Sequence, residues 1–258
     1  MDAEAQRGIS AALTVKDLSF SYSRGSSQFT DFHLALGPGR TALLGSNGAG
    51  KSTLLSLLAT VLKPSNGSIS LSFGPRAVES RRLGKYRARI AWLPQDFQPA
   101  AGLSVQEHVA YSAWLNGTDR KTSQKKAMPA LERVGLEQLA KHKATELSGG
   151  QQRRLGLAGA LAQDAAMILL DEPTAGLDPN QRDRFRMILQ EIDPEKIVLV
   201  STHQTEDIDG TFDQVLVMDQ GTMKFHGTVG DFMQLGSRAA DPRDQIREAY
   251  RCLVAGEH

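Results

Sequence analysis

The sequence lacks any long apolar run, which excludes a membrane-spanning helix of its own. A helix needs about 20 consecutive apolar residues to cross a bilayer, whereas the longest apolar runs here, such as Ala166–Leu170 and Ile197–Val200, have the length of buried strands. The first residues, MDAEAQRGIS, carry acidic residues and no apolar core, so they do not resemble a secretory signal. We expect a cytoplasmic protein that requires a partner for any role at a membrane.

The sequence also has only one cysteine and almost no net charge. The single cysteine, Cys252, excludes an internal disulfide, which suits a reducing compartment. The 30 Lys and Arg residues against 29 Asp and Glu residues give a net charge of +1, so the chain lacks the basic excess with which proteins neutralise nucleic-acid phosphates. We expect no nucleic-acid partner. The length of 258 residues and the apolar fraction of 40% suit one large domain with a buried core.

The pattern of apolar residues changes at Gly39. From Leu13 to Leu36 apolar and polar residues alternate loosely around a Ser/Gly-rich turn at Ser23–Ser27, which predicts antiparallel strands and a hairpin. Beyond Gly39, strands alternate with helices, which is typical of a parallel sheet. The predicted strands are Thr41–Leu44, Ile69–Phe73, Arg89–Leu93, Ala166–Asp171, Lys196–Ser201 and Gln214–Asp219, and the predicted helices include Lys51–Leu62 and Pro179–Ile192. Residues from about 96 to 165 carry helical patterns without a convincing strand, which suggests a helical insertion.

Gly45–Ser52 reads GSNGAGKS and lies between a predicted strand and a predicted helix. This is the pattern and the context of a phosphate-binding loop. Glycines let the backbone N–H groups approach phosphate oxygens, and the helix N-terminus attracts the anion. Lys51 is expected to reach the β- and γ-phosphates, and Ser52 to ligate Mg²⁺. The alternative, a glycine-rich turn that binds nothing, does not account for the strand and the helix on either side.

Two acids, Asp171 and Glu172, end the apolar strand MILL. Ligands of open α/β sheets bind at the carboxyl ends of strands, where the phosphate loop also lies. Asp171 is therefore placed to hold Mg²⁺ through water, and Glu172 to polarise an attacking water. Many strands end in acids, so this pair gains its meaning from the phosphate loop upstream.

Leu147–Gln151, LSGGQ, is a second glycine turn that precedes a helical pattern, which again suits an anion. Two such sites in one domain suggest that both contact the same nucleotide from opposite sides, or that one of them contacts a nucleotide bound to another copy of the chain. The alternative is a simple helix cap formed by Ser148. The following Arg153 and Arg154 are expected to be solvated helix residues.

With these motifs in this order and spacing, the sequence resembles the ATP-binding-cassette (ABC) ATPases from about Leu13 to Gly227. GSNGAGKST looks like their Walker A loop, LSGGQ is their signature motif without a mismatch, and MILLDEP looks like Walker B with its catalytic glutamate. The resemblance implies an α/β fold: a P-loop NTPase core with a mostly parallel sheet, an N-terminal antiparallel β subdomain and an inserted helical subdomain. We assign residues 1–258 to one ABC domain, with 13–95 and 166–230 as the core, 96–165 as the helical signature subdomain and 231–258 as a short C-terminal extension of no assigned role.

The resemblance also gives roles to single residues. Gln95 looks like the Q-loop glutamine, which contacts Mg²⁺ and the attacking water, and His203 like the switch histidine at the γ-phosphate, so both join Glu172 as catalytic candidates. Asp178, in AGLD, looks like the D-loop aspartate, and Tyr22 like the aromatic residue under adenine, although Phe20 lies close by. The implied nucleotide-binding residues are Tyr22, Gly45, Ser46, Asn47, Gly48, Ala49, Gly50, Lys51, Ser52, Thr53, Ser148, Gly149, Gly150, Gln151 and Asp178, and the implied metal ligands are Ser52, Gln95 and Asp171.

The resemblance implies a head-to-tail homodimer with two ATP molecules and Mg²⁺ between the Walker A loop of one chain and the signature of the other. The dimer would drive a separate integral membrane permease from the cytoplasmic face of the membrane. The segment GLSVQEHVAY and the short C-terminal extension favour an exporter over an importer. Two alternatives are a soluble ABC ATPase that acts on nucleic acid or ribosomes, whose relatives usually carry two cassettes or a coiled-coil insertion, and a P-loop kinase, which the intact LSGGQ disfavours.

Overall fold

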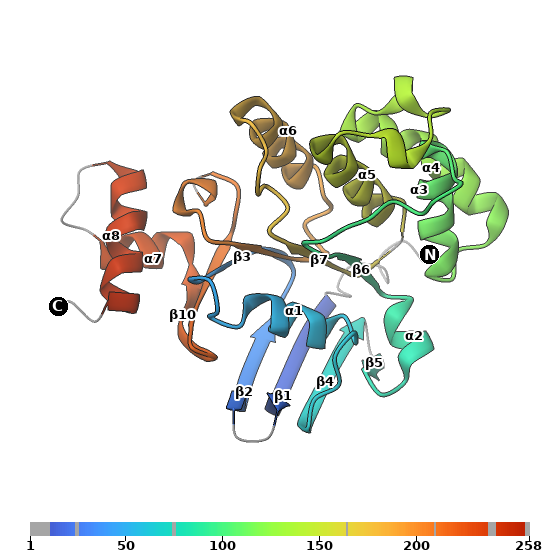
Figure 1. Cartoon of the computed structure of the whole chain (residues 1–258). Helices are drawn as coiled ribbons and strands as arrows, with labels where there is room; N and C mark the ends of the chain where they lie inside the picture. The colour runs from blue at the N-terminus through green and yellow to red at the C-terminus, as the bar shows by residue number, and fades with distance from the viewer. Residues whose placement is uncertain are drawn as a thin grey trace, which may run out of the picture.

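The computed structural model describes residues 11–23, 26–73, 76–163, 165–208, 210–236 and 241–255. The expected disordered leader, residues 1–10, lies outside the described residues, as does the middle of the turn predicted at Ser23–Ser27. The described part of the chain forms two β-sheets and a set of helices around them (Figure 1). The α-helices are α1 (Lys51–Leu58), α2 (Leu83–Arg87), α3 (Val105–Leu115), α4 (Arg120–Val134), α5 (Gly149–Ala162), α6 (Pro179–Gln190), α7 (Val229–Leu235) and α8 (Pro242–Ala255).

The larger sheet has six strands in the order β10-β9-β3-β8-β7-β6, and only the β10–β9 pair is antiparallel. Its strands are β3 (Gly39–Leu44), β6 (Ile90–Leu93), β7 (Met167–Asp171), β8 (Ile197–Thr202), β9 (Gln214–Asp219) and β10 (Thr222–Thr228). The smaller sheet is antiparallel in the order β2-β1-β4-β5, formed by β1 (Ala11–Ser23), β2 (Ser26–Leu36), β4 (Asn66–Phe73) and β5 (Arg76–Glu79). The predicted α/β fold with a mostly parallel sheet and an antiparallel N-terminal part is confirmed.

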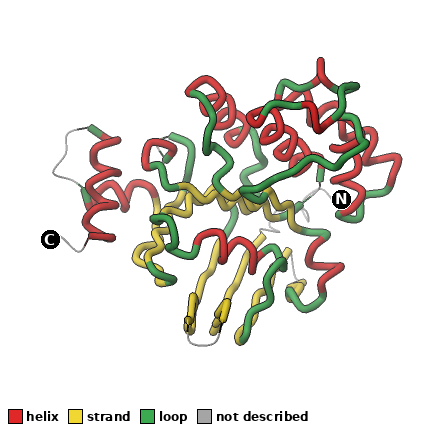
Figure 2. The backbone as a smooth tube through the Cα atoms, in the orientation of Figure 1, coloured by secondary structure: helices red, strands yellow, loops and turns green. Residues whose placement is uncertain are grey.

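The core is divided by the six-stranded sheet into two layers. Alternate residues of a strand face opposite sides, so Leu43 of β3 packs with α1 and the antiparallel sheet, whereas its neighbours Ala42 and Leu44 pack on the other side. Figure 1 shows α1 between the two sheets, and Figures 1 and 2 show α3, α4, α5 and α6 gathered on the opposite face of the six-stranded sheet. The helix α1 is therefore held from both sides, which fixes the loop that precedes it.

The structure contains β5 and α2, which were not predicted, and it differs from the predicted pattern in two further places. The helix predicted over Lys51–Leu62 ends at Leu58, because Thr60 takes a left-handed backbone (φ 60) and the amides of Thr60 and Val61 bond back to Leu57 and Ser56, which is a Schellman ending. The antiparallel edge strand β10 was not predicted. Its residues alternate between exposed and half-buried, so it lacks the buried apolar side chains by which the other strands of this sheet are recognised.

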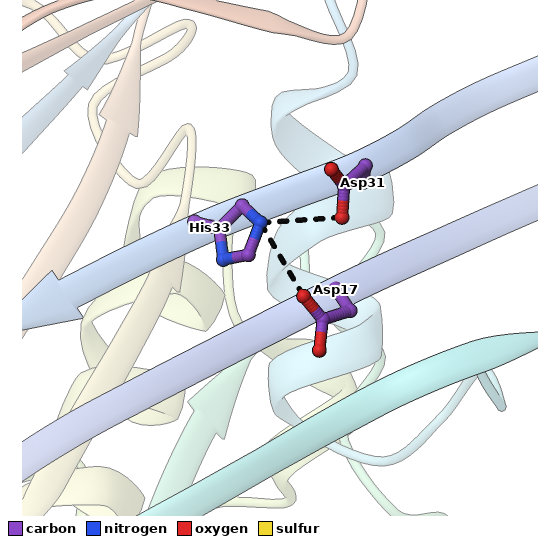
Figure 3. A group of neighbouring side chains, drawn as sticks. All are labelled: Asp17, Asp31 and His33. Atoms are coloured by element: carbon purple, nitrogen blue, oxygen red, sulfur yellow. Dashed lines mark hydrogen bonds and ion pairs between the residues drawn. The ribbon is translucent and has the colours of Figure 1, made fainter.

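Figure 3 shows Asp17, Asp31 and His33 together on the exposed face of the antiparallel sheet. The pairing of β1 with its neighbours shifts register around Asp17 and Asp31, and both take a left-handed backbone (φ 52 and φ 53) that Asp tolerates better than most residues. The Nε2 atom of His33 lies 3.5 Å from Asp17 Oδ1 and 3.2 Å from Asp31 Oδ1. The bulged strands thus bring an imidazole and two carboxylates into one solvent-exposed contact.

The side chain of Tyr86 is fully buried, and its hydroxyl has no hydrogen-bond partner among the described residues. Burial raises the pKa of Tyr86, so the phenol stays protonated. Since an unsatisfied buried hydroxyl destabilises the fold, we expect Tyr86→Phe to raise the free energy of unfolding by about 1 kcal/mol. Urea denaturation measures this, with the half-exposed Tyr111→Phe as a control that should change nothing. A loss of stability in Tyr86→Phe would mean that the hydroxyl is satisfied after all.

Candidate active site

The predicted phosphate loop joins the end of β3 to the start of α1, as the motif requires. A side chain at Gly45 would collide with the backbone oxygen of Met218, which lies 2.5 Å from the position of its Cβ, and Gly50 has φ 104. The loop is also tied to the β9–β10 turn, since the amide of Gly221 donates to the Ala49 carbonyl at 2.9 Å. Glycine at Gly45 and Gly50 is therefore needed for this loop to lie against the sheet.

Lys51 is held inside the loop. Its Nζ donates to the carbonyl oxygens of Gly45 (2.7 Å) and Ser46 (3.2 Å) and lies 3.6 Å from Glu172 Oε1. Burial lowers the pKa of Lys51, and the charge of Glu172 opposes that shift. An anion that entered this site would therefore contact an ammonium group that is already desolvated in the folded protein.

A cavity of about 350 Å³ opens beside Lys51. Among the described residues its lining comprises Gln28, Ser46, Asn47, Gly48, Gly50, Lys51, Ser52, Thr53, Gln95 and Glu172. The structure thus brings Gln95 and Glu172, which follow different strands, to the phosphate loop. Sequence reasoning missed Gln28, because nothing in the local pattern of β2 relates it to a loop 20 residues away.

Asp171 is buried at the end of β7, where it accepts a hydrogen bond from Ser201 Oγ at 2.6 Å and another from the Ser52 hydroxyl. Burial raises the pKa of Asp171, and the hydrogen bonds from Ser201 and Ser52 oppose that shift. The hydroxyl, the carboxylate and the nearby Gln95 amide are oxygen donors, which suit a hard cation such as Mg²⁺. Ser201 was also missed, although its place in a fully buried strand is a signal that its hydroxyl needs a partner.

Glu172 carries a strained backbone (φ 47), and two nitrogen-bearing side chains lie close to its carboxylate. Its amide donates to Ser201 Oγ at 2.8 Å. Its carboxylate lies between Lys51 and His203, with His203 Nδ1 2.6 Å from Oε2. The Glu172 side chain is 9% exposed and that of His203 is 44% exposed. The three predicted residues therefore meet at one point beside the cavity.

The expectation that Arg153 and Arg154 are solvated is wrong. Arg153 Nη1 donates to the Glu172 carbonyl at 2.9 Å, and Arg154 Nη1 donates to the carbonyls of Val134 (2.9 Å) and Gly135 (3.3 Å) at the end of α4. Both arginines are half-buried. Their partners are carbonyls 19 or 20 residues away along the chain, which a helical pattern cannot reveal.

The signature residues lie at the start of α5. The Ser148 hydroxyl accepts from the Gln151 amide at 3.4 Å while the Gln151 side chain accepts from the Ser148 amide at 2.9 Å, so the two form a capping box. The helix cap considered from the sequence is thus present. None of Ser148, Gly149, Gly150 or Gln151 is among the described residues that line the cavity. Ser148 and Gly149 are exposed, so this helix terminus is open to a second molecule.

Asp178 and Tyr22 are not among the described residues that line the cavity. Asp178 caps α6 by accepting from the Gln181 amide at 2.9 Å, and its side chain is exposed. The Tyr22 hydroxyl is 2.9 Å from Thr53 Oγ1, and its ring, which is 65% exposed, packs edge-on against Phe20. Tyr22 thus presents an aromatic surface next to the phosphate loop.

Comparison with known proteins gives three kinds of match. The family model described as ABC transporter matches residues 29–175. The chain is 35% identical over 193 residues to the uncharacterized ABC transporter ATP-binding protein YxlF of Bacillus subtilis, covering 75% of this chain and 63% of YxlF. It is 33% identical to the energy-coupling factor transporter ATP-binding protein EcfA2 of Lactiplantibacillus plantarum, covering 84% of this chain and 77% of that protein.

Among solved structures, cbiO1 of Clostridium perfringens, part of the ABC transporter complex cbiONQ, superposes with a TM-score of 0.70. The identity is 30%, and the match covers 84% of this chain and 88% of cbiO1. The chain spans less than two thirds of the length of several curated relatives, with 63% for YxlF and 55% for an EcfA2 protein of Methanospirillum hungatei. No described helix is long and apolar enough to cross a membrane.

Proposed function

The chain belongs to the ABC transporter family, and from that membership we propose that it binds and hydrolyses ATP to power transport through a separate permease. The observation that carries the proposal is the meeting of Lys51, Glu172 and His203 at the cavity of the phosphate loop. These are a phosphate-binding cation, a general base and a hydrogen-bond donor, the groups that phosphoryl transfer to water needs.

The loop amides and Lys51 would bind the β- and γ-phosphates. Ser52, Gln95 and Asp171 would hold Mg²⁺, which neutralises phosphate charge when it is bound. Glu172 would orient the attacking water and accept its proton, because its carboxylate reaches the cavity from a fixed backbone. His203, adjacent to that carboxylate, would donate to the γ-phosphate.

We further propose the head-to-tail homodimer, in which Ser148, Gly149, Gly150 and Gln151 complete the site of the neighbouring chain. The open start of α5 and its absence from the chain's own cavity lining support this arrangement. Tyr22 would lie under adenine, and Asp178 would couple the two sites across the dimer.

Ser148→Arg tests the dimer. The bulky cation would block the partner's γ-phosphate, so we expect ATP hydrolysis to fall at least about tenfold while ATP binding by the monomer is kept. Ser104→Arg is a matched control, because Ser104 also forms a capping box, at the start of α3. Both variants lose a similar cap, and only the Ser148 variant should lose turnover. Equal turnover in the two purified variants would contradict the trans contact.

The permease would dock on the helices that follow Gln95. The helix α3 exposes Tyr111, Trp114 and Leu115, and the rings of Tyr111 and Trp114 stack with centroids 5.9 Å apart. Exposed apolar groups of this kind mark interaction surfaces, which supports a protein partner here. The site would then work at the cytoplasmic face of a membrane.

Copurification from detergent-solubilised native membranes tests the transport role. We expect a stoichiometric polytopic membrane protein, whose sequence would also test the prediction that the transporter is an exporter. Recovery with ribosomes or nucleic-acid factors and without a membrane protein would leave the ATPase in place and overturn the transport role.

A further inference from the structure

Arg153 is one of three described groups that hold the backbone of Glu172. The others are the Ser201 hydroxyl and the Ala175 amide, which donates to the Glu172 carbonyl at 3.1 Å. The Nη1 atom of Arg153 donates to the same carbonyl at 2.9 Å, and the Ser201 hydroxyl accepts from the Glu172 amide at 2.8 Å. Both peptide groups that flank the Glu172 side chain are thereby fixed. Ser201 also donates to Asp171, so it serves the adjacent carboxylate, whereas the side chain of Arg153 comes from a different element, the signature helix α5.

The conformation that these bonds hold is an unfavourable one. With φ 47, Glu172 lies in the left-handed region, which a residue with a long side chain seldom enters unless its surroundings impose it. The rotation of this backbone sets the direction in which the carboxylate leaves the strand end. In the structure that direction places Oε1 3.6 Å from Lys51 and Oε2 2.6 Å from His203.

Arg153 also lies close to the start of α5. It is the fifth residue of the helix, and at 1.5 Å per residue it lies about 6 Å along the axis from Gly149. Helix α5 packs on α3 and α4 and begins with the Ser148–Gln151 capping box. A shift of this helix terminus is therefore carried to the Arg153 side chain by a rigid segment little longer than one turn.

We propose that Arg153 is a positioning residue for Glu172, and that through it the signature helix of a chain sets the carboxylate geometry in that chain's own site. This rests on the proposed function, in which the start of α5 contacts the nucleotide of the neighbouring chain. Nucleotide contact at one site is then linked to the base of the other through a single side chain. Arg153 is not among the described residues that line the cavity, and its hydrogen bond goes to the Glu172 carbonyl, so it acts on turnover and not on ATP affinity.

The experiment compares Arg153→Gln, Arg153→Lys and Arg154→Gln in the full chain, by ATPase kinetics, ATP titration and thermal melting. Arg153→Gln should lower kcat about 10- to 100-fold, as expected for a misplaced base, with KM within about twofold of wild type. Arg153→Lys should restore most of kcat, because one N–H donor suffices for the bond. Arg154→Gln makes the same change one residue away and loses the contacts to α4, so it should lower the melting temperature and leave kcat within about twofold.

A double variant separates positioning from general damage. If Arg153 acts through the Glu172 carboxylate, Arg153→Gln added to Glu172→Gln should lower kcat no further than Glu172→Gln alone. Wild-type kcat in Arg153→Gln, additive losses in the double variant, or a Lys variant as impaired as the Gln variant would each overturn the inference. Absence of ATP hydrolysis by the wild-type protein would overturn the proposed function itself, and the inference with it.

Discussion

Lys51→Ala should lower ATP affinity about 10- to 100-fold, since a hydrogen bond to a charged group contributes about 1.5–3 kcal/mol and each 1.4 kcal/mol is a factor of ten. The physical reason is the position of the ammonium group. It is 5% exposed and is held by the carbonyls of Gly45 and Ser46 at the wall of the cavity, so it does not need to be desolvated or ordered when phosphate arrives. Alanine removes this charge, and no second lysine or arginine is among the described residues that line the cavity.

Titration with a fluorescent ATP analogue measures the loss, with Lys63→Ala as control. Lys63 is an exposed lysine in the turn beyond α1, so its removal changes the net charge equally without touching the cavity. A melting curve on each variant separates lost binding from lost folding. Unaltered affinity in a folded Lys51→Ala protein would remove Lys51 from the phosphate site.

The lowered pKa of Lys51 predicts that ATP affinity depends on pH, and it predicts the direction of that dependence. Burial favours the neutral amine, whereas bound phosphate favours the ammonium form, so ATP binding takes up a proton wherever the free site is partly neutral. Affinity should therefore fall as pH rises through the lowered pKa of Lys51. Lys51→Ala should lose this slope, and a slope that survives in that variant would assign it to another group.

The sequence predicts the parts of this site that consist of residues adjacent to one another along the chain. The loop at Gly45–Ser52 depends on glycine conformations and a helix start, and the pair Asp171 and Glu172 on an apolar strand ending in acids, so both are visible locally. The resemblance to a family adds Gln95 and His203, which no local rule singles out. The structure places Gln95, Glu172 and Lys51 around one cavity, with His203 against Glu172.

What the sequence does not predict depends on contacts between distant segments. Ser201 bonds to Asp171 across the parallel pairing of β7 with β8, 30 residues away. Arg153 has the sequence surroundings of a solvated helix residue, and only the packing of α5 against the strand ends turns it toward Glu172. The edge strand β10 is also not predicted from the sequence. An edge strand can stay half-exposed, so it can lack the apolar pattern that marks a buried strand.

Glu172→Gln should bind ATP at least as well as wild type and lower its hydrolysis by about a thousandfold, within the range that general-base catalysis contributes. The amide has the size of the carboxylate and can still accept a hydrogen bond, but it cannot take a proton from the attacking water. In the presence of ATP the variant should accumulate as an ATP-bound dimer, seen by size-exclusion chromatography. Glu191→Gln is the matched control, since Glu191 is exposed at the end of α6 and its change should leave both quantities unaltered. Wild-type turnover in Glu172→Gln would place the base elsewhere.

The expectation of undiminished affinity follows from what the Glu172 carboxylate contacts in the structure. Its carboxylate lies between Lys51 and His203, the two groups proposed to meet the γ-phosphate. An entering phosphate must compete with that carboxylate for Lys51 and His203 and is repelled by its charge at short range. Glutamine removes the repulsion and weakens the competition, so the loss of the base and a gain in binding come from the same substitution. Lys51→Ala has the opposite balance, because it removes the attraction and leaves the Glu172 charge facing the phosphate. This arrangement of charges therefore predicts that Lys51→Ala loses ATP affinity, that Glu172→Gln keeps or gains it, and that both variants lose turnover.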